Sequence, residues 1–145
     1  AVGADQAFEH GCVGFPAEIF LPWKGYQSNA SMLWNIPPGA MQIASCIHPA
    51  WQGLSHSEQK FIAGAGLQIL GQELNKPVDF VVCWTPDGAQ SESERSRNTG
   101  GTGQAIALAD RWQIPIFNLA RPDALNGIAK LLGRAHPAAM TAQID

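Results

Sequence analysis

The chain has 145 residues, of which 46% are hydrophobic and 14% charged, a composition that suits one compact domain and excludes wholesale disorder. A formal net charge of -3 gives no general electrostatic field for nucleic-acid phosphates, so we expect no nucleic-acid partner. The longest apolar runs fall far short of the roughly 20 residues that span a bilayer, and no membrane association is expected.

The spacing of cysteines and histidines gives no sign of a disulfide framework or a zinc site. Cys12, Cys46 and Cys83 are widely separated and odd in number, which favours a reducing, cytoplasmic location. The four histidines show no ligand spacing of the His-x-x-x-His kind. We therefore predict neither a metal nor a cofactor.

The first part of the chain predicts a helix, a short strand and an aromatic loop. Residues 6–10 have a helical pattern, and residues 18–21 form a short apolar strand stopped by Pro22. Trp23 and Tyr26 follow, where they either cover the sheet edge or form a platform for a planar ligand such as a nucleobase. A doubly wound domain begins with a strand, so we expect a first strand that is missing here or supplied elsewhere.

Two helices are predicted in the middle of the chain. Pro37 and Pro38 suit the first turn of a helix over residues 39–47. Ser55 and Glu58 have the spacing of a capping box and would begin the second helix. Glycines within that second helix each weaken it by up to ~1 kcal/mol relative to alanine, so we expect them to permit close packing.

The segment from residue 79 to residue 118 predicts a βαβ unit. An apolar run over 79–84, a helical pattern over 104–112 and a second apolar run over 114–119 give strand, helix and strand. Such a unit has parallel strands and a right-handed crossover. The predicted fold is therefore α/β, a Rossmann-like parallel sheet with helices on both faces in three layers, in one domain over residues 1–145.

The remaining segments are a polar loop and a C-terminal helix. Residues 89–98 are polar and charged, and we expect a mobile solvated loop, with a flap that closes over a ligand as the alternative. Pro122 precedes an amphipathic helix over residues 123–132. Residues beyond Arg134 are expected to form a frayed tail.

Loops from several elements are expected to meet at the carboxyl edge of the sheet, where parallel sheets bind ligands. Glycines let a backbone approach a phosphate, and the free N–H groups of the next helix bind it; the alternative is a glycine turn that only packs the helix. The dinucleotide pattern G-x-G-x-x-G and the P-loop are absent. The candidate ligand-binding residues are Gly3, Asp5, Trp23, Trp84, Thr85, Gly100, Gly101, Thr102, Gly103, Gln104 and Asn118.

A family resemblance rests on four segments: Gly3-Ala4-Asp5, the strand end Val81–Thr85, the glycine segment Thr99–Gln104, and Ile114–Asn118. Together they resemble the SLOG superfamily of Rossmann-like proteins. That group includes the LOG phosphoribohydrolases, the DNA-processing protein A family and small bacterial and phage proteins, to which the chain is most similar. The resemblance implies a nucleotide or nucleotide-derived ligand with its phosphate against the glycine loop, and a homodimer.

One departure from the LOG pattern bears on catalysis. LOG enzymes carry Pro-Gly-Gly-x-Gly-Thr-x-x-Glu, and the glutamate assists cleavage of an N-glycosidic bond. Laid on this sequence from Thr99, the glutamate position falls on Ala107 and the threonine becomes Gln104. The missing carboxylate leaves ligand binding as the expectation, with Asp5 contacting ribose or capping the first helix. The alternatives are a nucleoside-phosphate N-glycosidase with Asp5 as its catalytic carboxylate, a DNA-binding module, and a structural or assembly role.

Overall fold

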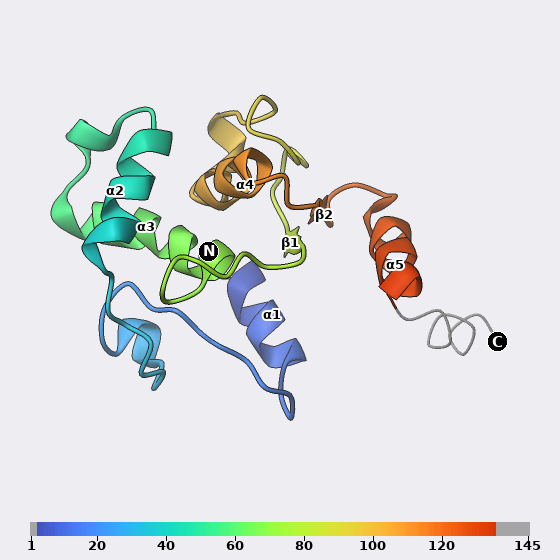
Figure 1. The fold of residues 1–145 in the computed structure, drawn as a ribbon, viewed down its shortest axis with the longest axis horizontal. Coiled ribbons are helices and arrows are strands. Elements are labelled where there is room, and N and C mark those ends of the chain that lie inside the picture. The colour runs from blue at the N-terminus through green and yellow to red at the C-terminus, as the bar shows by residue number, and fades with distance from the viewer. Residues whose placement is uncertain (1–2, 136–145) are drawn as a thin grey trace.

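The structure, a computed structural model, describes residues 3–135, which form a mixed helix-and-sheet fold with a parallel sheet of two strands (Figure 1). Short turns of 3-10 helix lie at Tyr26–Ser28, Trp51–Gly53 and Arg97–Thr99. No helix in this part of the chain has the length and apolar character needed to cross a membrane. The helices are α1 (Ala4–Gly11), α2 (Pro38–Ile47), α3 (His56–Leu70), α4 (Thr102–Arg111) and α5 (Ala124–Ala135), and the strands are β1 (Val81–Cys83) and β2 (Ile116–Asn118).

The predicted βαβ unit is confirmed by β1, α4 and β2. The two strands pair in parallel, with Val81 opposite Ile116 and Cys83 opposite Asn118. Both strands are shorter than the apolar runs that predicted them. Pro115 has no N–H to donate, so the ladder of β2 begins one residue later.

Helices pack on both sides of β2, which lies between α4 and α5 in Figure 1. Buried side chains of α3, α4 and β2 form one apolar core that includes Ile69, Ile106 and Ile116. On α5, Gly127 lets the helix approach β2, because a Cβ there would lie 2.8 Å from Cε1 of Phe117. Within residues 3–135 only β1 and β2 pair along their length, so the wider three-layer Rossmann-like sheet stays a prediction.

The strand predicted over residues 18–21 is reduced to one isolated bridge between Phe20 and Leu33. The Leu21 N–H donates to the Leu33 carbonyl at 2.8 Å, and the Ser31 hydroxyl donates to the Ile19 carbonyl at 2.5 Å. These two contacts from Ser31 and Leu33 are formed instead of the continuous ladder that a longer partner strand would provide. Burial follows the prediction in part, since Leu21 is buried and Phe20 is half-buried.

The two helices in the middle of the chain form as predicted. Pro38 occupies the first turn of α2, and Ser55 caps α3. The Glu58 N–H donates to Ser55 Oγ at 3.3 Å and the Ser55 N–H donates to Glu58 Oε2 at 2.7 Å, which completes the capping box. A Cβ at Gly66 would meet Cδ2 of Leu74 at 3.7 Å and the Cβ of Ala40 at 3.9 Å, which are ordinary van der Waals distances, and a Cβ at Gly64 would meet no atom within 4 Å. The expectation that glycines permit close packing of this helix is therefore wrong at these two positions. The predicted tail beyond Arg134 lies almost wholly outside the described residues.

Candidate functional site

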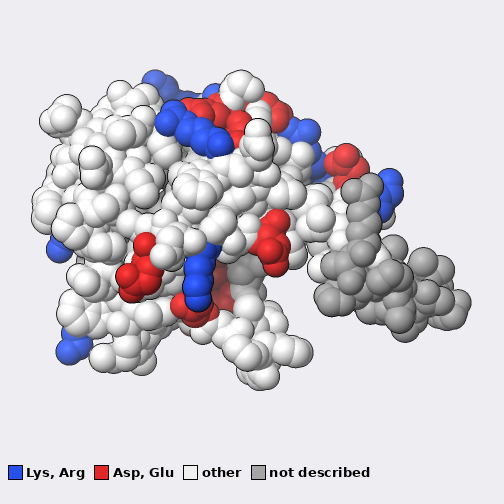
Figure 2. All heavy atoms as spheres, in the orientation of Figure 1, with Lys and Arg blue, Asp and Glu red and all other residues white. Residues whose placement is uncertain are grey.

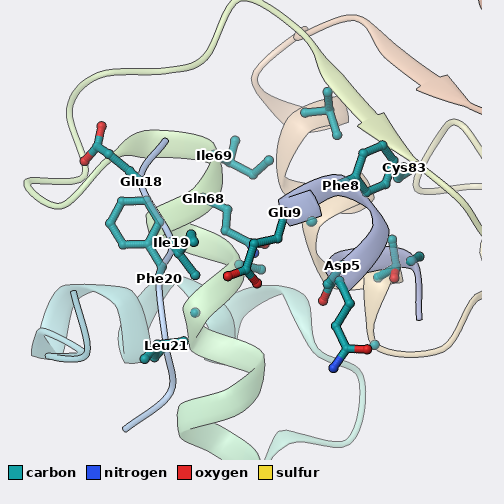
Figure 3. Close-up of a pocket in the computed structure, with 18 of the residues that line it drawn as sticks. Asp5, Phe8, Glu9, Glu18, Ile19, Phe20, Leu21, Gln68, Ile69 and Cys83 are labelled. Carbon is teal, nitrogen blue, oxygen red and sulfur yellow. The ribbon is translucent and has the colours of Figure 1, made fainter. Parts of the chain in front are cut away.

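A cavity of about 630 Å³ lies between α1, α3, the segment around Phe20, the end of β1 and the start of α4 (Figure 3). Four predicted site residues line it: Asp5 on α1, Trp84 after β1, and Gly101 and Thr102 at the start of α4. These residues come from three segments far apart in the sequence. The cavity therefore brings together predicted site residues that are distant in the sequence.

The start of α4 offers main-chain donors to the cavity. Gly101 precedes the helix, and its lack of a side chain leaves the helix end uncapped by any side-chain oxygen. The N–H groups of Gly101 and Thr102 have no hydrogen-bond acceptor within residues 3–135. Gly100 turns the chain into the helix with φ +65°, a left-handed conformation that glycine adopts without strain. An uncapped helix start of this kind attracts anions.

A guanidinium group adds positive charge at the same helix end. A Cβ at Gly103 would lie 2.9 Å from Nε of Arg95, so the Arg95 side chain rests on the first turn of α4. Partial burial lowers the pKa of Arg95 from its ordinary value, and the nearby Arg111 acts in the same direction, whereas Glu92 opposes both. No hydrogen bond or ion pair engages this guanidinium within the described part of the chain. A cation at the positive end of a helix dipole is favourable once an anion joins it.

Aromatic rings surround the same end of the cavity. Trp84 is 49% exposed and lines the cavity together with Tyr26 and Phe61. Trp23 does not line the cavity, but its ring meets that of Tyr26 edge-on at 5.1 Å, and Tyr26 in turn meets Phe61 at 6.0 Å. Of the two residues predicted as an aromatic platform, Tyr26 therefore lines the cavity and Trp23 contacts Tyr26 from outside it, and their role toward a planar ligand stays a prediction.

Carboxylates dominate the charge of the cavity wall. Asp5, Glu9 and Glu18 line it, and none of the described lining residues is lysine or arginine. Asn29 donates to Glu9 Oε1 at 2.9 Å, which fixes one of these carboxylates. The cavity is therefore acidic along α1 and at Glu18, and positive only where α4 begins.

Three of the predicted site residues lie in the interior instead. Asn118 and Thr85 are 0% and 1% exposed, and they bind each other and neighbouring main chain. Gln104 is 3% exposed and donates to the Ala44 carbonyl of α2 at 3.2 Å. Two residues along a helix amount to a rotation of about 200°, so Gln104 points away from the wall that Thr102 forms. None of the three side chains lines the cavity, and each is hydrogen-bonded in the interior, so their role as ligand contacts stays a prediction from sequence.

The remaining glycines of the prediction frame the site without lining the cavity. Gly100 and Gly103 flank the lining residues, and Gly103 is covered by Arg95. Gly3 is exposed and precedes α1 with φ +103°. Ala107, where the LOG pattern has its glutamate, is fully buried in the core beneath α4. A carboxylate at position 107 would have no access to the cavity.

The polar segment after β1 is anchored at many points, unlike the mobile loop that its composition favoured. Asp87 accepts hydrogen bonds from the hydroxyls of Thr99, Ser96 and Thr85 at 2.5, 2.7 and 2.7 Å. These donors, led by Thr99, hold the pKa of the Asp87 carboxyl well below its usual range. The segment is exposed in part and yet tied to the start of α4.

Two ion pairs complete this anchoring. Glu92 accepts two hydrogen bonds from Arg111 on α4, at 2.8 Å from Nε and 2.6 Å from Nη2. Arg121 binds Glu94 with its Nη2 and donates from Nε to the Gly88 carbonyl at 2.6 Å. Glu92 and Glu94 before Arg95 and Ser96 after it are therefore all fixed by hydrogen bonds, which holds the Arg95 side chain against α4.

Sequence reasoning missed several residues of the site. Phe61 and Glu18 belong to elements that were predicted, but their exposure to a cavity depends on how those elements pack. Arg95 lies in the polar segment over residues 89–98, for which the sequence predicted a mobile loop. The signal for its position was Gly103, because a glycine in the first helical turn leaves room for a neighbouring side chain.

Comparisons with protein-family models, with curated proteins and with solved structures found no match for this chain. The resemblance to the SLOG superfamily therefore stays a prediction from sequence motifs. Functional assignment rests on the geometry of the cavity.

Proposed function

We propose that the protein binds a nucleotide or nucleotide derivative with one phosphate, at the end of the cavity where β1 ends and α4 begins. The observation that carries this proposal is that Asp5, Trp84, Gly101 and Thr102 lie on the walls of one cavity. Its volume of about 630 Å³ falls within the ~300–1,000 Å³ typical of small-molecule sites.

The phosphate binds at the start of α4. The N–H groups of Gly101 and Thr102 are available as donors, and the helix dipole favours negative charge there. Arg95 adds a full positive charge beside the same turn. The helix start and Arg95, which packs against Gly103 and does not itself line the cavity, therefore both raise the electrostatic potential at this end of α4.

The base and the sugar occupy the rest of this end. Trp84 and Tyr26 present aromatic faces and edges for a planar base. Asp5, which lines the same cavity, would accept hydrogen bonds from ribose hydroxyls, since an ionised carboxylate is an acceptor only.

A monophosphate suits this cavity better than a triphosphate. Asp5, Glu9 and Glu18 line the cavity and no lysine or arginine does so among the described residues. Each further phosphate would approach these carboxylates without a cation to neutralise it, at a cost that grows as the site loses water. The proposed ligand therefore carries its charge only at the end near α4.

A ligand panel tests the proposal by thermal shift and calorimetry. We expect AMP and other nucleoside monophosphates to stabilise the protein, with ATP, ADP-ribose and adenosine weaker than AMP. At a concentration of about 100 times Kd, the stabilisation is ~2.7 kcal/mol, or roughly 2–4 °C in Tm for each kcal/mol. No shift with any compound of the panel, on folded protein, would contradict the proposal.

A charge-reversal variant ties the effect to the start of α4. Gly101→Asp places a carboxylate where the phosphate binds, and the space accepts it, because a Cβ at Gly101 meets only Phe61 Cε1 at 3.6 Å. We expect loss of AMP binding with little change in fold. Gly53→Asp adds the same charge at an exposed position away from the cavity and serves as the control.

Hydrolysis of the ligand is the second candidate, and the place of Asp5 on the cavity wall favours it. In that case Asp5 acts as the catalytic carboxylate of a nucleoside-phosphate N-glycosidase. Release of free base from AMP, followed by chromatography, measures the reaction. Base release that persists in Asp5→Asn would rule out Asp5 as the catalytic carboxylate. Binding of AMP without any release of base would show that the protein binds the nucleotide and does not hydrolyse it.

The DNA-binding alternative finds less support in the surface. On the face shown in Figure 2, Asp and Glu atoms lie beside the Lys and Arg atoms along the upper edge, so this edge is not uniformly positive.

A homodimer is part of the proposal as well, because α5 exposes Leu125 (71%) and Leu132 (42%) to solvent. Light scattering measures the assembly, and a gel shift at low salt measures DNA binding.

A further inference from the structure

The carboxylate of Glu9 on α1 is held in place by a chain of hydrogen bonds. Asn29 Nδ2 donates to Glu9 Oε1 at 2.9 Å, and the Ser31 N–H donates to Asn29 Oδ1 at 2.9 Å. The Ser31 hydroxyl in turn donates to the Ile19 carbonyl at 2.5 Å. Glu9 and Ile19 both line the cavity. These hydrogen bonds therefore fix the Glu9 carboxylate relative to another segment of the cavity wall.

This carboxylate still has accepting capacity for a ligand. Glu9 Oε2 receives no hydrogen bond within residues 3–135, and no lysine or arginine is among the described residues that line the cavity. An ionised carboxylate only accepts hydrogen bonds, and its two oxygens offer about four lone-pair sites. A ligand group that binds Glu9 is therefore a donor, and two adjacent N–H groups match the two oxygens best.

An aromatic ring belongs to the same turn as the residue that holds Glu9. Tyr26 lines the cavity and begins the 3-10 turn Tyr26–Ser28, which ends at Asn29. The Asn29 N–H donates to the Tyr26 carbonyl at 3.0 Å. The Tyr26 ring packs edge-on against Phe61 of α3, with the ring centres 6.0 Å apart. One short segment therefore sets both a ring for a planar base and the carboxylate for its hydrogen-bonding edge.

Glu9 lies one helical turn beyond Asp5, which the proposed function assigns to the ribose. Residues four apart lie on the same face of a helix, about 6 Å from each other along its axis. Both residues line the cavity, and in the view of Figure 3 Glu9 lies between Asp5 and Ile19. In a nucleotide whose ribose contacts Asp5, we therefore expect Glu9 to meet the base.

We propose that the base at this site is guanine, and that Glu9 accepts hydrogen bonds from its N1–H and its N2 amino group. Guanine carries these two donors side by side on its Watson–Crick edge. Adenine and cytosine place a ring-nitrogen lone pair next to their amino group, and uracil has a single N–H between two carbonyls. A carboxylate therefore repels part of that edge in each of these three bases. The inference rests on the proposed nucleotide function and names the base within it.

Gln68 of α3 matches the remaining group of the guanine edge. Its side chain lines the cavity and forms no hydrogen bond within the described part of the chain. Figure 3 shows Gln68 and Glu9 extending into the cavity from α3 and α1. The Gln68 amide donates to the O6 carbonyl of guanine, while Glu9 accepts from the two nitrogen donors. The two side chains thus fit the order of acceptor, donor and donor that guanine presents.

Calorimetry with GMP, IMP and AMP tests the base. Guanine has both donors, hypoxanthine keeps N1–H but lacks the amino group, and adenine lacks N1–H. We expect Kd to rise in the order GMP, IMP, AMP, with GMP at least about tenfold tighter than AMP. The phosphate and the ribose are common to all three ligands, so the ratio of Kd values reports on the base alone.

Glu9→Gln ties the preference to this carboxylate. The new amide both accepts and donates, so it matches the adenine edge and loses one acceptor for guanine. We expect the preference for GMP over AMP to fall at least about tenfold. Glu73→Gln makes the same change at an exposed residue that does not line the cavity, and it should keep the preference of the parent protein. Glu9 is itself exposed, so the fold tolerates the substitution.

Asn29→Ala tests the positioning of the carboxylate. Without the hydrogen bond to Glu9 Oε1, the carboxylate is no longer held for two donors at once. We expect the Kd for GMP to rise while the Kd for AMP stays close to that of the parent protein. A residue with a merely structural role would weaken the binding of both nucleotides by the same factor.

The outcomes separate this inference from the proposed function. Equal binding of GMP and AMP by the parent protein, or an unchanged preference in Glu9→Gln, would overturn the assignment of guanine and leave the nucleotide site standing. No binding of any of the three nucleotides by folded protein would overturn both.

Discussion

Asn118 at the end of β2 and Thr85 just beyond β1 are joined by two hydrogen bonds in the interior of the protein. The amide Nδ2 of Asn118 donates to Thr85 Oγ1 at 2.6 Å, and its Oδ1 accepts from the Thr85 N–H at 3.2 Å. The same side chain also donates to the Ala89 carbonyl at 2.9 Å and accepts from the Ala120 N–H at 3.1 Å. One amide thus connects the two loops that leave the sheet at its carboxyl edge.

Asn118→Ala is expected to lower the free energy of unfolding by about 2–3 kcal/mol, because it leaves buried main-chain groups without partners. Urea denaturation followed by circular dichroism measures the change. Asn126→Ala, at an exposed position on α5, is the control and should stay close to the parent protein. A loss below about 0.5 kcal/mol for Asn118→Ala would show that water replaces the amide.

The local signals of the sequence were sufficient for the elements around this connection. Pro38 and the Ser55–Glu58 box act within one helical turn, so their pattern identifies the starts of α2 and α3 without knowledge of packing. The apolar runs on either side of a helical pattern predicted the parallel pair for a similar reason. Such a unit has one common arrangement, and the structure adopts it.

Packing between distant segments decided what the sequence could not show. Asn118 and Thr85 have the polar character expected at a ligand site, but their partners are each other. Gln104 is polar and yet binds α2, because the rotation of α4 turns it inward. The position of Arg95 depends on the anchoring of its whole segment, for which no short motif exists.

Two glycine-to-alanine substitutions, one in α5 and one in α3, are expected to change the free energy of unfolding in opposite directions. Gly127→Ala is expected to destabilise the protein by about 1–3 kcal/mol, because the new Cβ would lie 2.8 Å from Cε1 of Phe117. Gly64→Ala in α3 meets no atom within 4 Å, so the higher helix propensity of alanine should stabilise by about 0.5–1 kcal/mol. Chemical denaturation of both variants measures the change in the free energy of unfolding, which should be a decrease for Gly127→Ala and an increase for Gly64→Ala.

The double variant with Phe117→Leu identifies the cause. A smaller side chain at Phe117 removes the atoms that the new Cβ meets, so Gly127→Ala should cost less in that background. If Gly127→Ala lowers the free energy of unfolding equally in the parent protein and in Phe117→Leu, the destabilisation does not come from the contact with Phe117.

Acidification is expected to destabilise the protein through Asp87. Hydrogen bonds from Thr99, Ser96 and Thr85 lower the pKa of Asp87 in the folded state. Their contribution is present above the unfolded pKa of about 3.9 and is lost as the pH falls below that value toward the folded pKa. Tm measured between pH 6 and pH 2.5 should therefore fall more steeply in the parent protein than in Asp87→Asn. Parallel curves for the two proteins would contradict this role of Asp87.

The cysteines should differ in reactivity according to their burial. Burial, and to a lesser extent the charge of Asp87, raises the pKa of Cys83 to about 11. The thiolate is the reactive form, and a rise of the pKa from 9.0 to about 11 leaves ~100-fold less thiolate at Cys83 at pH 7.5 than at an unshifted thiol. Cys12 and Cys46 are exposed. Titration with a chromogenic disulfide should find these two thiols in the native protein and Cys83 only after unfolding in guanidinium. In Cys83→Ala the native count should stay the same while the count after unfolding falls by one. Rapid reaction of Cys83 in the native state would mean that its end of the cavity opens to solvent.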